Sequence, residues 1–485
     1  MDTLQQTIEN TVKNLLVKIG EEKDAGKIKN DFSIKDDLGI DSLDGIQLIS
    51  ALEDTFQIDI PDRNFDSSLK VGDIINLVQS RLNASAEKIQ GKIDKASLIN
   101  SLRVDKSLLS EAQFNPYYRN IQSGLGGKIR IDNKEFICLG SNDYLGIANN
   151  PKIKNVAIKA IRKYGLSMCG TPIVIGQSDA NRALELKIAE FLKQDDALVF
   201  PSGFQSNIGI FQLLANKDDV ILADKNIHSS LINGCLLAKA DLKLFRHNDT
   251  KDLETLLNNS VKYRMRFIVV EGLYSTDGDI APLDRISALA KEFDSFLIVD
   301  DAHGIGVLGR EGRGILEKFN AYKDIDLISG SLGKAIGLSG GFLAGKESII
   351  DHFKYNCPMY FYSTALPAHI AAAGISAIDF IQAHNDIRIK IFKYKEKLFG
   401  ALKDMGYRLS ESKTPLFSIL FRNSQETVKF SKLLFEKLVY TVAFIPPSVP
   451  EDSPRIRILA SAYLKDKDID KAIAVFKALK KEYVG

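Results

Sequence analysis

Apolar residues near the start of the chain recur at helical spacing. Two such runs occur, at Ile8, Val12, Leu15 and Leu16 and again at Ile46, Ile49, Leu52 and Phe56. They predict a small helical bundle over residues 1–82. Asp41 is placed to cap the second helix, and Asp44 falls in its first turn, where the helix dipole favours negative charge.

Residues 83–105 form a polar stretch with few apolar positions. This composition predicts a linker, partly helical, between two folded modules. If the linker were a flexible coil, its length of about 20 residues would give an r.m.s. reach of roughly 25 Å.

From residue 106 onward, short apolar runs alternate with helical stretches and glycine-rich turns. The runs expected to form buried strands are Ala197–Phe200, Val220–Leu222, Phe267–Val270 and Phe296–Val299. This alternation predicts a doubly wound α/β domain, with its N-terminal segment, over residues 106–384; ligands of such domains bind at the carboxyl ends of the strands. Helices mixed with shorter strands predict a smaller α/β lobe over residues 385–485.

Charge is distributed unevenly over these modules. The whole chain has a net charge of +2, but residues 1–82 hold nine Lys and Arg against 16 Asp and Glu. The first module is therefore at −7 and the remainder at +9. Opposite charges favour docking of the two modules on each other, although two unrelated solvated surfaces would give the same totals.

Other features bear on location and partners. The chain has no Lys- and Arg-rich stripe with interleaved aromatics, as nucleic-acid binding would need, and no apolar run near the roughly 18 residues of a membrane span. Its start lacks the basic and apolar regions of a signal peptide, so a cytoplasmic location is expected. Four scattered cysteines without metal-ligand spacing fit a reducing compartment: Cys138, Cys169, Cys235 and Cys357.

The predicted strand Phe296–Val299 runs into Asp300, and His303 follows three residues later. A carboxylate at the end of a buried strand requires a cationic or hydrogen-bonding partner. Asp300 could keep a pyridine nitrogen protonated and make the ring an electron sink, while His303 could reach the ring hydroxyl. A metal site is the rival interpretation, but no third ligand lies at a suitable spacing.

Lys334 lies at the end of another predicted strand among several glycines. This setting favours a lysine that forms a Schiff base. A phosphate loop is excluded by spacing, because only two residues separate Gly330 from Gly333 and Ala335 follows the lysine.

Two further turns after strands contain candidate residues. At Gly203 and Phe204 a strand turns into a helix, whose N-terminal amides could bind phosphate. His228 follows another strand and could stack on an aromatic ring. Taken alone, a histidine in this position more often has a structural role.

The motif Asp-Ser-Leu-Asp around Ser42 places a serine at the start of a helix between two acidic residues. Together with the acidity and helical pattern of residues 1–82, it resembles the acyl carrier proteins. The resemblance implies that Ser42 carries a covalent 4'-phosphopantetheine, attached by a phosphopantetheinyl transferase and loaded by a separate acylating enzyme. Arg63 departs from the family, in which an acid commonly occupies that position.

Residues 110–480 resemble the α-oxoamine synthases, which are pyridoxal-phosphate (PLP) enzymes of fold type I with an aminotransferase class I/II-like fold. The resemblance rests on the four strand ends above and on three further segments, Ser141–Gly146, Glu271–Asp279 and Pro446–Arg457. The family includes 8-amino-7-oxononanoate synthase and serine palmitoyltransferase. It implies PLP as cofactor, a homodimer, and decarboxylative condensation of an amino acid with an acyl thioester.

The resemblance assigns four catalytic residues. Lys334 would bind PLP covalently and move the proton at the substrate α-carbon. Asp300 would pair with the pyridine nitrogen, His303 would address the ring hydroxyl, and His228 would stack on the ring.

The resemblance also assigns binding residues. The cofactor phosphate would be held by the amides of Gly203 and Phe204 and by Ser331, with Ser275 nearby. Arg457 would receive the amino-acid carboxylate. The remaining substrate residues would be Asn142, Ser448 and, for the acyl donor, Arg119.

Two departures from the family lie where the acyl thioester is expected to enter. Pro172 follows Gly170 and Thr171 where many members have arginine, and Asn181 stands near a position that is often histidine. Both leave the cofactor chemistry intact and argue against the family's usual acyl-CoA substrates.

The sequence therefore predicts a PLP-dependent acyltransferase that takes its acyl group from its own carrier. A tethered donor reaches an effective concentration in about the mM range. Two alternatives stay open: the same chemistry on free acyl-CoA with the carrier as a docking or regulatory module, and a non-catalytic carrier scaffold. The sequence defines neither the small amino acid nor the acyl chain. The pathway that uses the product could equally lead to a lipid, a pigment or another secondary metabolite.

Overall fold

The computed structural model describes residues 106–483 and residues 2–88, apart from Glu21, Lys23, Asp41, Gln57, Asp59 and residues 61–68. The predicted cap Asp41 and most of the predicted linker thus lie outside the described residues. The chain forms two compact units, residues 1–111 with 446–452 and residues 112–445 with 453–485, and each is considered by itself.

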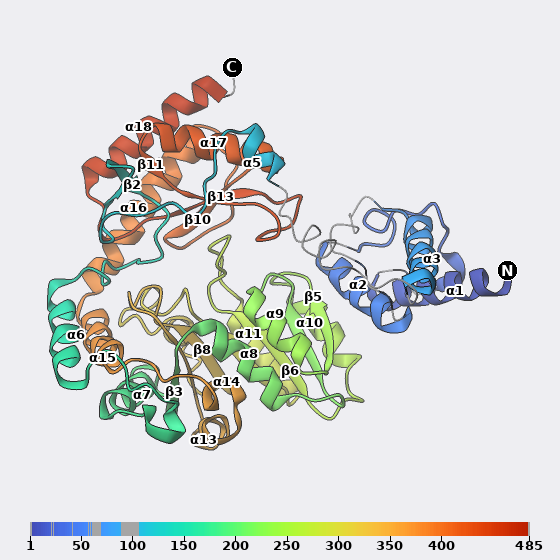
Figure 1. Ribbon diagram of the computed structural model, residues 1–485, viewed down its shortest axis with the longest axis horizontal. Helices are drawn as coiled ribbons and strands as arrows, with labels where there is room; N and C mark the ends of the chain where they lie inside the picture. Colours follow the sequence, from blue (N-terminus) through green and yellow to red (C-terminus); the bar gives the residue numbers. More distant parts are fainter. Residues whose placement is uncertain are drawn as a thin grey trace. The chain divides into compact units, whose positions relative to one another are not determined.

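The N-terminal unit is helical, as the apolar spacing predicts. Its helices are α1 (Asp2–Ile19), α2 (Ser42–Phe56) and α3 (Val71–Lys88), with a 3₁₀ turn at Ala25–Lys27 (Figure 1). Apolar residues spaced along α1, α2 and α3 pack into one core, because each helix presents a single apolar stripe. Helix α3 continues to Lys88, so the first residues of the predicted linker are helical.

The larger unit is built on a seven-stranded sheet with the order β3-β9-β8-β7-β6-β4-β5. The strands are β3 (Asp196–Phe200), β4 (Val220–Asp224), β5 (Asp241–Phe245), β6 (Arg266–Glu271), β7 (Phe296–Asp300), β8 (Leu327–Ser331) and β9 (Gly341–Gly345). Only β9 runs antiparallel to its neighbours. This is the doubly wound sheet that the sequence predicts.

Three strands extend one or two residues beyond the predicted apolar runs. Strands β4, β6 and β7 each end in a carboxylate that is almost fully buried, at Asp224, Glu271 and Asp300. Apolar patterning stops short of these residues because it scores a carboxylate as exposed. The carboxyl ends of parallel strands meet at one edge of the sheet, so these three buried acids are brought together there.

Helices surround the sheet in the larger domain (Figure 1). They are α6 (Pro151–Tyr164), α7 (Asp179–Leu192), α8 (Gly203–Leu214), α9 (Ser229–Leu237), α10 (Thr250–Asn258), α11 (Leu283–Glu292), α12 (Ile315–Phe319), α13 (Glu347–Asn356), α14 (Pro358–Phe361) and α15 (Ala368–Ala383). The central strands are apolar on both faces because helices cover both sides.

The smaller lobe holds two three-stranded sheets. One has the order β10 (Leu416–Leu420), β13 (Arg455–Leu459), β12 (Val442–Phe444), and the other has the order β1 (Lys128–Ile131), β2 (Lys134–Cys138), β11 (Val439–Tyr440). Helices α16 (Asn385–Asp404), α17 (Ser424–Glu436) and α18 (Asp466–Tyr483) complete it, and α5 (Ser107–Glu111) precedes β1 along the chain. The hairpin β1–β2 therefore pairs with the smaller lobe, although it precedes the large sheet in sequence.

No helix in the described ranges is long and apolar enough to cross a bilayer. Within the same ranges, no three His, Cys, Asp or Glu side chains are grouped as a metal ion would require. All four cysteines are free thiols.

Candidate active site

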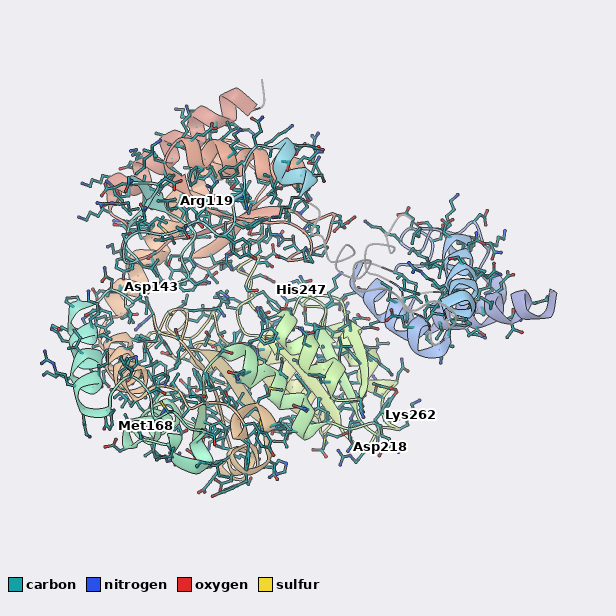
Figure 2. The ribbon with its side chains drawn as sticks, in the orientation of Figure 1. Arg119, Asp143, Met168, Asp218, His247 and Lys262 are labelled. Carbon is teal, nitrogen blue, oxygen red and sulfur yellow. The ribbon has the colours of Figure 1, made fainter. Side chains whose placement is uncertain are left out.

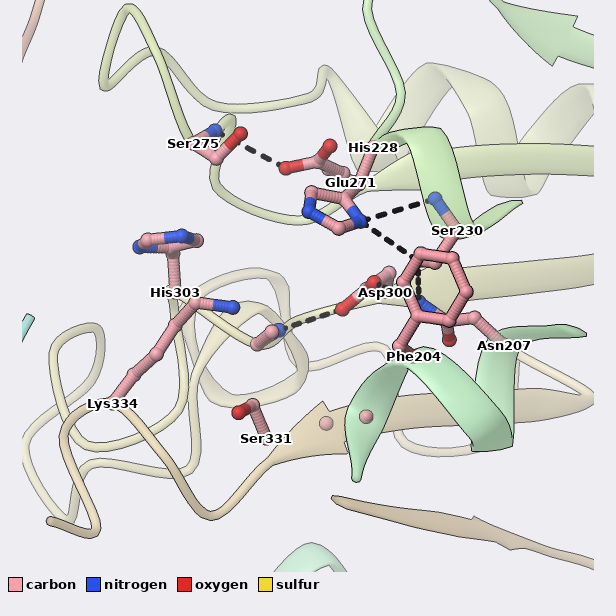
Figure 3. A pocket seen from close by; sticks show the side chains of 13 residues that line it. Phe204, Asn207, His228, Ser230, Glu271, Ser275, Asp300, His303, Ser331 and Lys334 are labelled. Carbon is pink, nitrogen blue, oxygen red and sulfur yellow. Dashed lines mark hydrogen bonds between the residues drawn. The ribbon is translucent and has the colours of Figure 1, made fainter. Parts of the chain in front are cut away.

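A cavity lies at the carboxyl ends of the central strands (Figure 3). Its lining comes from the segments after five strands: Gly203, Phe204 and Asn207 after β3; His228 and Ser230 after β4; Glu271 and Ser275 at and after β6; Asp300, Ala302 and His303 at and after β7; and Gly330, Ser331 and Lys334 at and after β8. All eight residues that the sequence assigned to the cofactor line this cavity.

Asp300 is held by two hydrogen bonds at the end of β7. The side-chain amide of Asn207 donates to Asp300 Oδ2 at 2.7 Å, and the backbone N–H of Ala302 donates to Oδ1 at 2.9 Å. Only 6% of Asp300 is exposed, so these donors fix the carboxylate in one orientation. Asn207 was missed by the sequence analysis; the available signal was a polar residue one helical turn after Gly203.

His228 precedes α9 and is joined to Asp300 through two polar residues. The backbone N–H of Ser230 donates to His228 Nδ1 at 3.2 Å, and the Ser230 hydroxyl lies 2.7 Å from the same nitrogen. Asn207 in turn donates to the Ser230 hydroxyl at 2.9 Å. Burial lowers the pKa of His228, with Asp300 opposing this and the charge of Lys334 adding to it. Because Nδ1 accepts the Ser230 N–H, the neutral ring carries its proton on Nε2.

His303 is fully buried and neutral. Burial, together with the positive charges of Lys334 and Arg457, holds its pKa well below the usual value. The Tyr144 hydroxyl lies 2.9 Å from His303 Nδ1. Tyr144 belongs to the Ser141–Gly146 segment that the sequence singled out, yet its part in fixing His303 becomes visible only when the two segments are folded together.

Lys334 extends from the loop after β8 into the cavity (Figure 3). Burial lowers the pKa of its amine, and the positive charge of Arg457 adds to this, while Asp300 and Glu271 oppose it. A lowered pKa increases the neutral form, which attacks a carbonyl carbon.

Glu271 is a second buried acid that the sequence analysis did not assign. Its Oε2 accepts the backbone N–H of Ser275 at 3.1 Å, while Oε1 is buried without a hydrogen-bond partner. Burial, reinforced by the nearby charge of Asp300, raises the pKa of Glu271 well above the usual value. A buried acid with an unused oxygen at the cavity wall is available to a ligand.

The N-terminus of α8 forms another part of the cavity wall; the helix begins at Gly203 and is capped by the Ser202 side chain. A Cβ on Gly341 would lie 2.3 Å from the Gly203 Cα, so β9 approaches this helix end closely only because Gly341 lacks a side chain. The exposed amides of a helix N-terminus, with the Ser331 hydroxyl beside them, suit a phosphate.

Arg457 comes from β13 of the smaller lobe and is 8% exposed. Its guanidinium donates to the Asn142 side-chain carbonyl at 2.9 Å and to the Ser275 backbone carbonyl at 3.0 Å. Among the described residues no carboxylate pairs with it. The structure thus brings together Arg457, Asn142 and Ser275, and leaves a buried cation able to accept an anionic substrate group.

None of the four predicted substrate residues is among those that line the cavity, although Arg457 donates to Ser275, which does line it. The Arg119 guanidinium lies over the rings of Phe114 and Phe435, at 4.8 and 4.7 Å, within the smaller lobe (Figure 2). Ser448 is exposed in the segment between β12 and β13. Ser42 is the first residue of α2, and its side chain is outside the described set.

The two departures from the family lie on neighbouring segments of the large domain. Pro172 starts a single π-helical turn, Pro172–Gly176, whose side chains at 173–175 are exposed and apolar. Asn181 is buried in α7 and donates to the Leu366 carbonyl at 2.8 Å, so it serves the packing of this region.

The residues at the cavity fit pyridoxal phosphate. The ring nitrogen, ring hydroxyl, aldehyde and phosphate of PLP require an acid, a polar partner, an amine and an anion site, and the cavity supplies each of them. Two of its buried polar atoms, Glu271 Oε1 and Asn207 Oδ1, have no hydrogen-bond partner. Such orphaned atoms are expected where a polar ligand belongs.

Comparison with known proteins agrees with this chemistry. The family model for aminotransferase class I and II matches residues 134–476, and the model for the phosphopantetheine attachment site matches residues 12–78. The 8-amino-7-oxononanoate synthase of Thermoanaerobacter pseudethanolicus is 37% identical, covering 80% of this chain and 99% of that protein. The 8-amino-7-oxononanoate synthase 2 of Bacillus subtilis is 38% identical, covering 75% and 94% respectively.

Two solved structures are also similar. The serine palmitoyltransferase of Sphingomonas wittichii has 27% identity and a TM-score of 0.76, covering 80% of this chain and 99% of that one. A serine palmitoyltransferase variant from S. paucimobilis with a bound PLP–myriocin aldimine has 26% identity and a TM-score of 0.77, with the same coverage.

The fold and site define a PLP-dependent enzyme of fold type I. The chain belongs to the aminotransferase class I and II family and, within it, to the α-oxoamine synthases, which are acyltransferases. It also contains a phosphopantetheine attachment domain, so its cofactors are PLP and covalent 4'-phosphopantetheine.

Proposed function

We propose that this enzyme condenses a small amino acid with an acyl group carried as a thioester on the phosphopantetheine of its own Ser42. The observation that carries the proposal is the presence of a carrier domain and a synthase domain in one chain. Tethering raises the effective concentration of the donor to about the mM range, which a soluble acyl-CoA would have to match. The proposed boundaries are 1–82 for the carrier, 83–105 for the linker, and 106–384 and 385–485 for the two catalytic lobes.

PLP, when bound, supplies an electron sink for charge that develops at the amino-acid α-carbon. Asp300, oriented by Asn207, is proposed to keep the ring nitrogen protonated. His228 is proposed to lie against the PLP ring. The neutral His303, whose Nδ1 is next to the Tyr144 hydroxyl, is proposed to address the PLP ring hydroxyl through its other nitrogen, Nε2. The α8 amides and Ser331 are proposed to hold the phosphate.

The amino acid is proposed to bind through its carboxylate to Arg457, with Asn142 alongside. A buried guanidinium offers two parallel N–H groups to a carboxylate. Lys334 lines the cavity together with Ser275, the residue that Arg457 contacts, and is proposed to remove the α-proton and to return a proton to that carbon at the end of the reaction.

The overall reaction consumes one proton from solvent and needs no other reactant. A carbon–carbon bond forms between the α-carbon and the acyl carbon, and the acyl carbon–sulfur bond breaks with release of the carrier thiolate. The carbon–carboxylate bond then breaks to release carbon dioxide, and the α-carbon is reprotonated. The products are an α-amino ketone, carbon dioxide and the carrier thiolate, which takes a proton from solvent.

Intact-protein mass spectrometry tests the proposal. The chain is modified at Ser42 by a phosphopantetheinyl transferase, loaded with a test acyl group, and mixed with single amino acids. One amino acid is expected to remove the acyl mass and yield the ketone. Ser42→Ala should prevent loading, and Lys334→Ala should load normally but keep its acyl group. Persistence of the acyl mass with every amino acid, combined with turnover of free acyl-CoA, would establish the alternative donor.

Two assembly proposals accompany the function. The family resemblance implies a homodimer, which mass photometry of the holoenzyme at nanomolar concentration would detect as twice the 53.7 kDa chain mass. An acyl-loading enzyme is also required, because the catalytic chemistry consumes a thioester and does not form one.

A further inference from the structure

His247 lies between two acidic side chains on the side of the large domain that faces the smaller lobe (Figure 2). Its Nδ1 is 2.9 Å from Asp224 Oδ1, and its Nε2 is 2.6 Å from Asp279 Oδ2. Asp224 is completely buried, and Asp279 is about one-fifth exposed. Neither the sequence analysis nor the proposed chemistry gives this histidine a role.

The neighbouring residue strengthens the same connection. The backbone N–H of Asn248 donates to Asp224 Oδ2 at 2.8 Å, and its side-chain amide donates to Asp279 Oδ2 at 2.7 Å. The His247 ring also packs edge-on against the Tyr274 ring at 4.4 Å. The end of β4 is thereby tied to the turn Tyr274–Asp279, which follows β6.

This turn is part of the substrate site. Ser275 lines the cavity, its N–H binds Glu271, and its carbonyl accepts a hydrogen bond from Arg457. A displacement of the turn would therefore move one of the two groups that orient the Arg457 guanidinium.

The smaller lobe binds the other side of the same turn. Its hydroxyls donate to three consecutive backbone carbonyls of the turn: Ser418 to Thr276, Ser410 to Asp277, and Ser412 and Thr414 to Gly278. Arg455, two residues before Arg457 on β13, forms an ion pair with Asp277. The turn is thus the joint between the lobes, and on the large-domain side His247 is bonded to its last residue.

We propose that His247 is a positioning residue that binds Asp224 and Asp279 together and so sets the position of the turn, the orientation of Arg457 and the affinity for the amino-acid carboxylate. The inference rests on the proposed role of Arg457. It requires no contact between His247 and substrate, since the effect passes through Asp279, the turn and the Ser275 carbonyl.

Amino-acid binding is measured without the acyl donor, by titrating the visible absorbance of PLP in the holoenzyme. His247→Gln keeps one donor and loses the bridge, and its dissociation constant for the amino acid is expected to rise about tenfold, the effect of one charge-assisted hydrogen bond. Its PLP content should be unchanged. The matched control is His384→Gln, which removes another half-buried histidine, bonded to the Phe380 carbonyl, and should bind the amino acid normally.

A double-mutant cycle separates positioning from general damage. Asp279→Asn keeps His247 but removes one charge, so it should weaken binding in the same direction. The double variant with His247→Gln is expected to be no weaker than the worse single variant, because both break one bridge. Additive effects would overturn the inference, and Asp279→Asn also serves if His247→Gln does not fold.

Arg457→Ala separates failure of the His247 positioning role from failure of the proposed carboxylate site. If it weakens amino-acid binding while His247→Gln and Asp279→Asn do not, the positioning role is wrong and the proposed carboxylate site stands. If Arg457→Ala leaves binding unchanged, the carboxylate site is wrong and the inference fails with it.

Discussion

Asn207 lies in the buried interior of α8, where a helix facing a sheet ordinarily presents an apolar side chain. Its amide donates both to Asp300 and to Ser230, so one residue aligns the acid on β7 with the residue that binds His228. A polar group is tolerated at this position because both hydrogens of the amide are used, and their value is in orienting charged and catalytic groups rather than in packing.

Asn207→Ala is expected to weaken PLP binding and turnover by about 10- to 100-fold, since hydrogen bonds to charged groups contribute about 1.5–3 kcal/mol. PLP affinity is read from absorbance titration of the apoenzyme. The exposed Asn233 of α9 provides a control, because Asn233→Ala removes the same amide without touching Asp300. Equal behaviour of the two variants would contradict the orienting role.

The turn that joins the two lobes requires glycine at position 278. Its φ is +76°, and a Cβ there would lie 1.9 Å from the Leu416 carbonyl oxygen and 2.6 Å from the Ser412 hydroxyl. Gly278→Ala is therefore expected to lower the free energy of unfolding by about 2–4 kcal/mol, since backbone strain and displaced packing add. Thermal unfolding at fixed scan rate would measure it.

Gly400, one turn before the C-terminal end of α16, is the matched control for that experiment. Nothing lies within 4 Å of the position of its Cβ, and its φ is not positive. Gly400→Ala should raise stability by about 0.5–1 kcal/mol, because alanine is the better helix former. If Gly400→Ala lowers the free energy of unfolding as much as Gly278→Ala does, the close contacts at the turn between the lobes are not the cause of the loss.

At the scale of elements, the sequence predicted the sheet and the cavity edge well because both depend on local patterns. Four apolar runs and the polar residues that follow them identified β3, β4, β6 and β7, and parallel strands bring such residues to one edge. The pattern could not assign Glu271, Asn207 or Tyr144, whose functions depend on which side chains approach them from other elements. It also could not place the hairpin β1–β2, since period-two alternation does not name a partner strand.

Glu271 at the end of β6 predicts a pH-dependent stability in the apoenzyme. Its pKa is raised in the folded state by burial, so above the usual value the folded state binds more protons than the unfolded state. Stability then falls as pH rises from about 4.5. Glu271→Gln removes this cost, and is expected to be more stable than the parent at pH 8 by about 1–3 kcal/mol. Urea unfolding at pH 5 and pH 8 measures the difference, which should shrink at the lower pH.

At the scale of the whole molecule, the covalent link between carrier and synthase distinguishes this chain from the two 8-amino-7-oxononanoate synthases described above, which are covered almost completely by 75–80% of it. The local chemistry of both parts is visible in the sequence, because each depends on short motifs. The predicted substrate residues are less well supported: Arg119, assigned to the acyl donor, stacks on two rings, Ser448 is exposed, and neither lines the cavity.

Delivery of the acyl group by a tethered carrier predicts unimolecular kinetics. After loading, the rate of acyl loss at saturating amino acid should be first order and unchanged over about a hundredfold dilution of the protein. In contrast, a loaded Lys334→Ala chain mixed with a Ser42→Ala chain must react between chains and should slow on dilution if the carrier serves its own subunit. A dilution-dependent rate in the parent would contradict delivery within the assembly.

The pairing of hairpin β1–β2 with β11 has a consequence for synthesis of the chain on the ribosome. Strand β2 ends at Cys138 and its partner begins at Val439, so about 300 residues, including the whole large sheet, are translated between them. At about 5–20 residues per second, the nascent hairpin waits for about 15–60 seconds before its sheet can close. The large domain can fold during this interval, before the strand that contributes Arg457 has been synthesised.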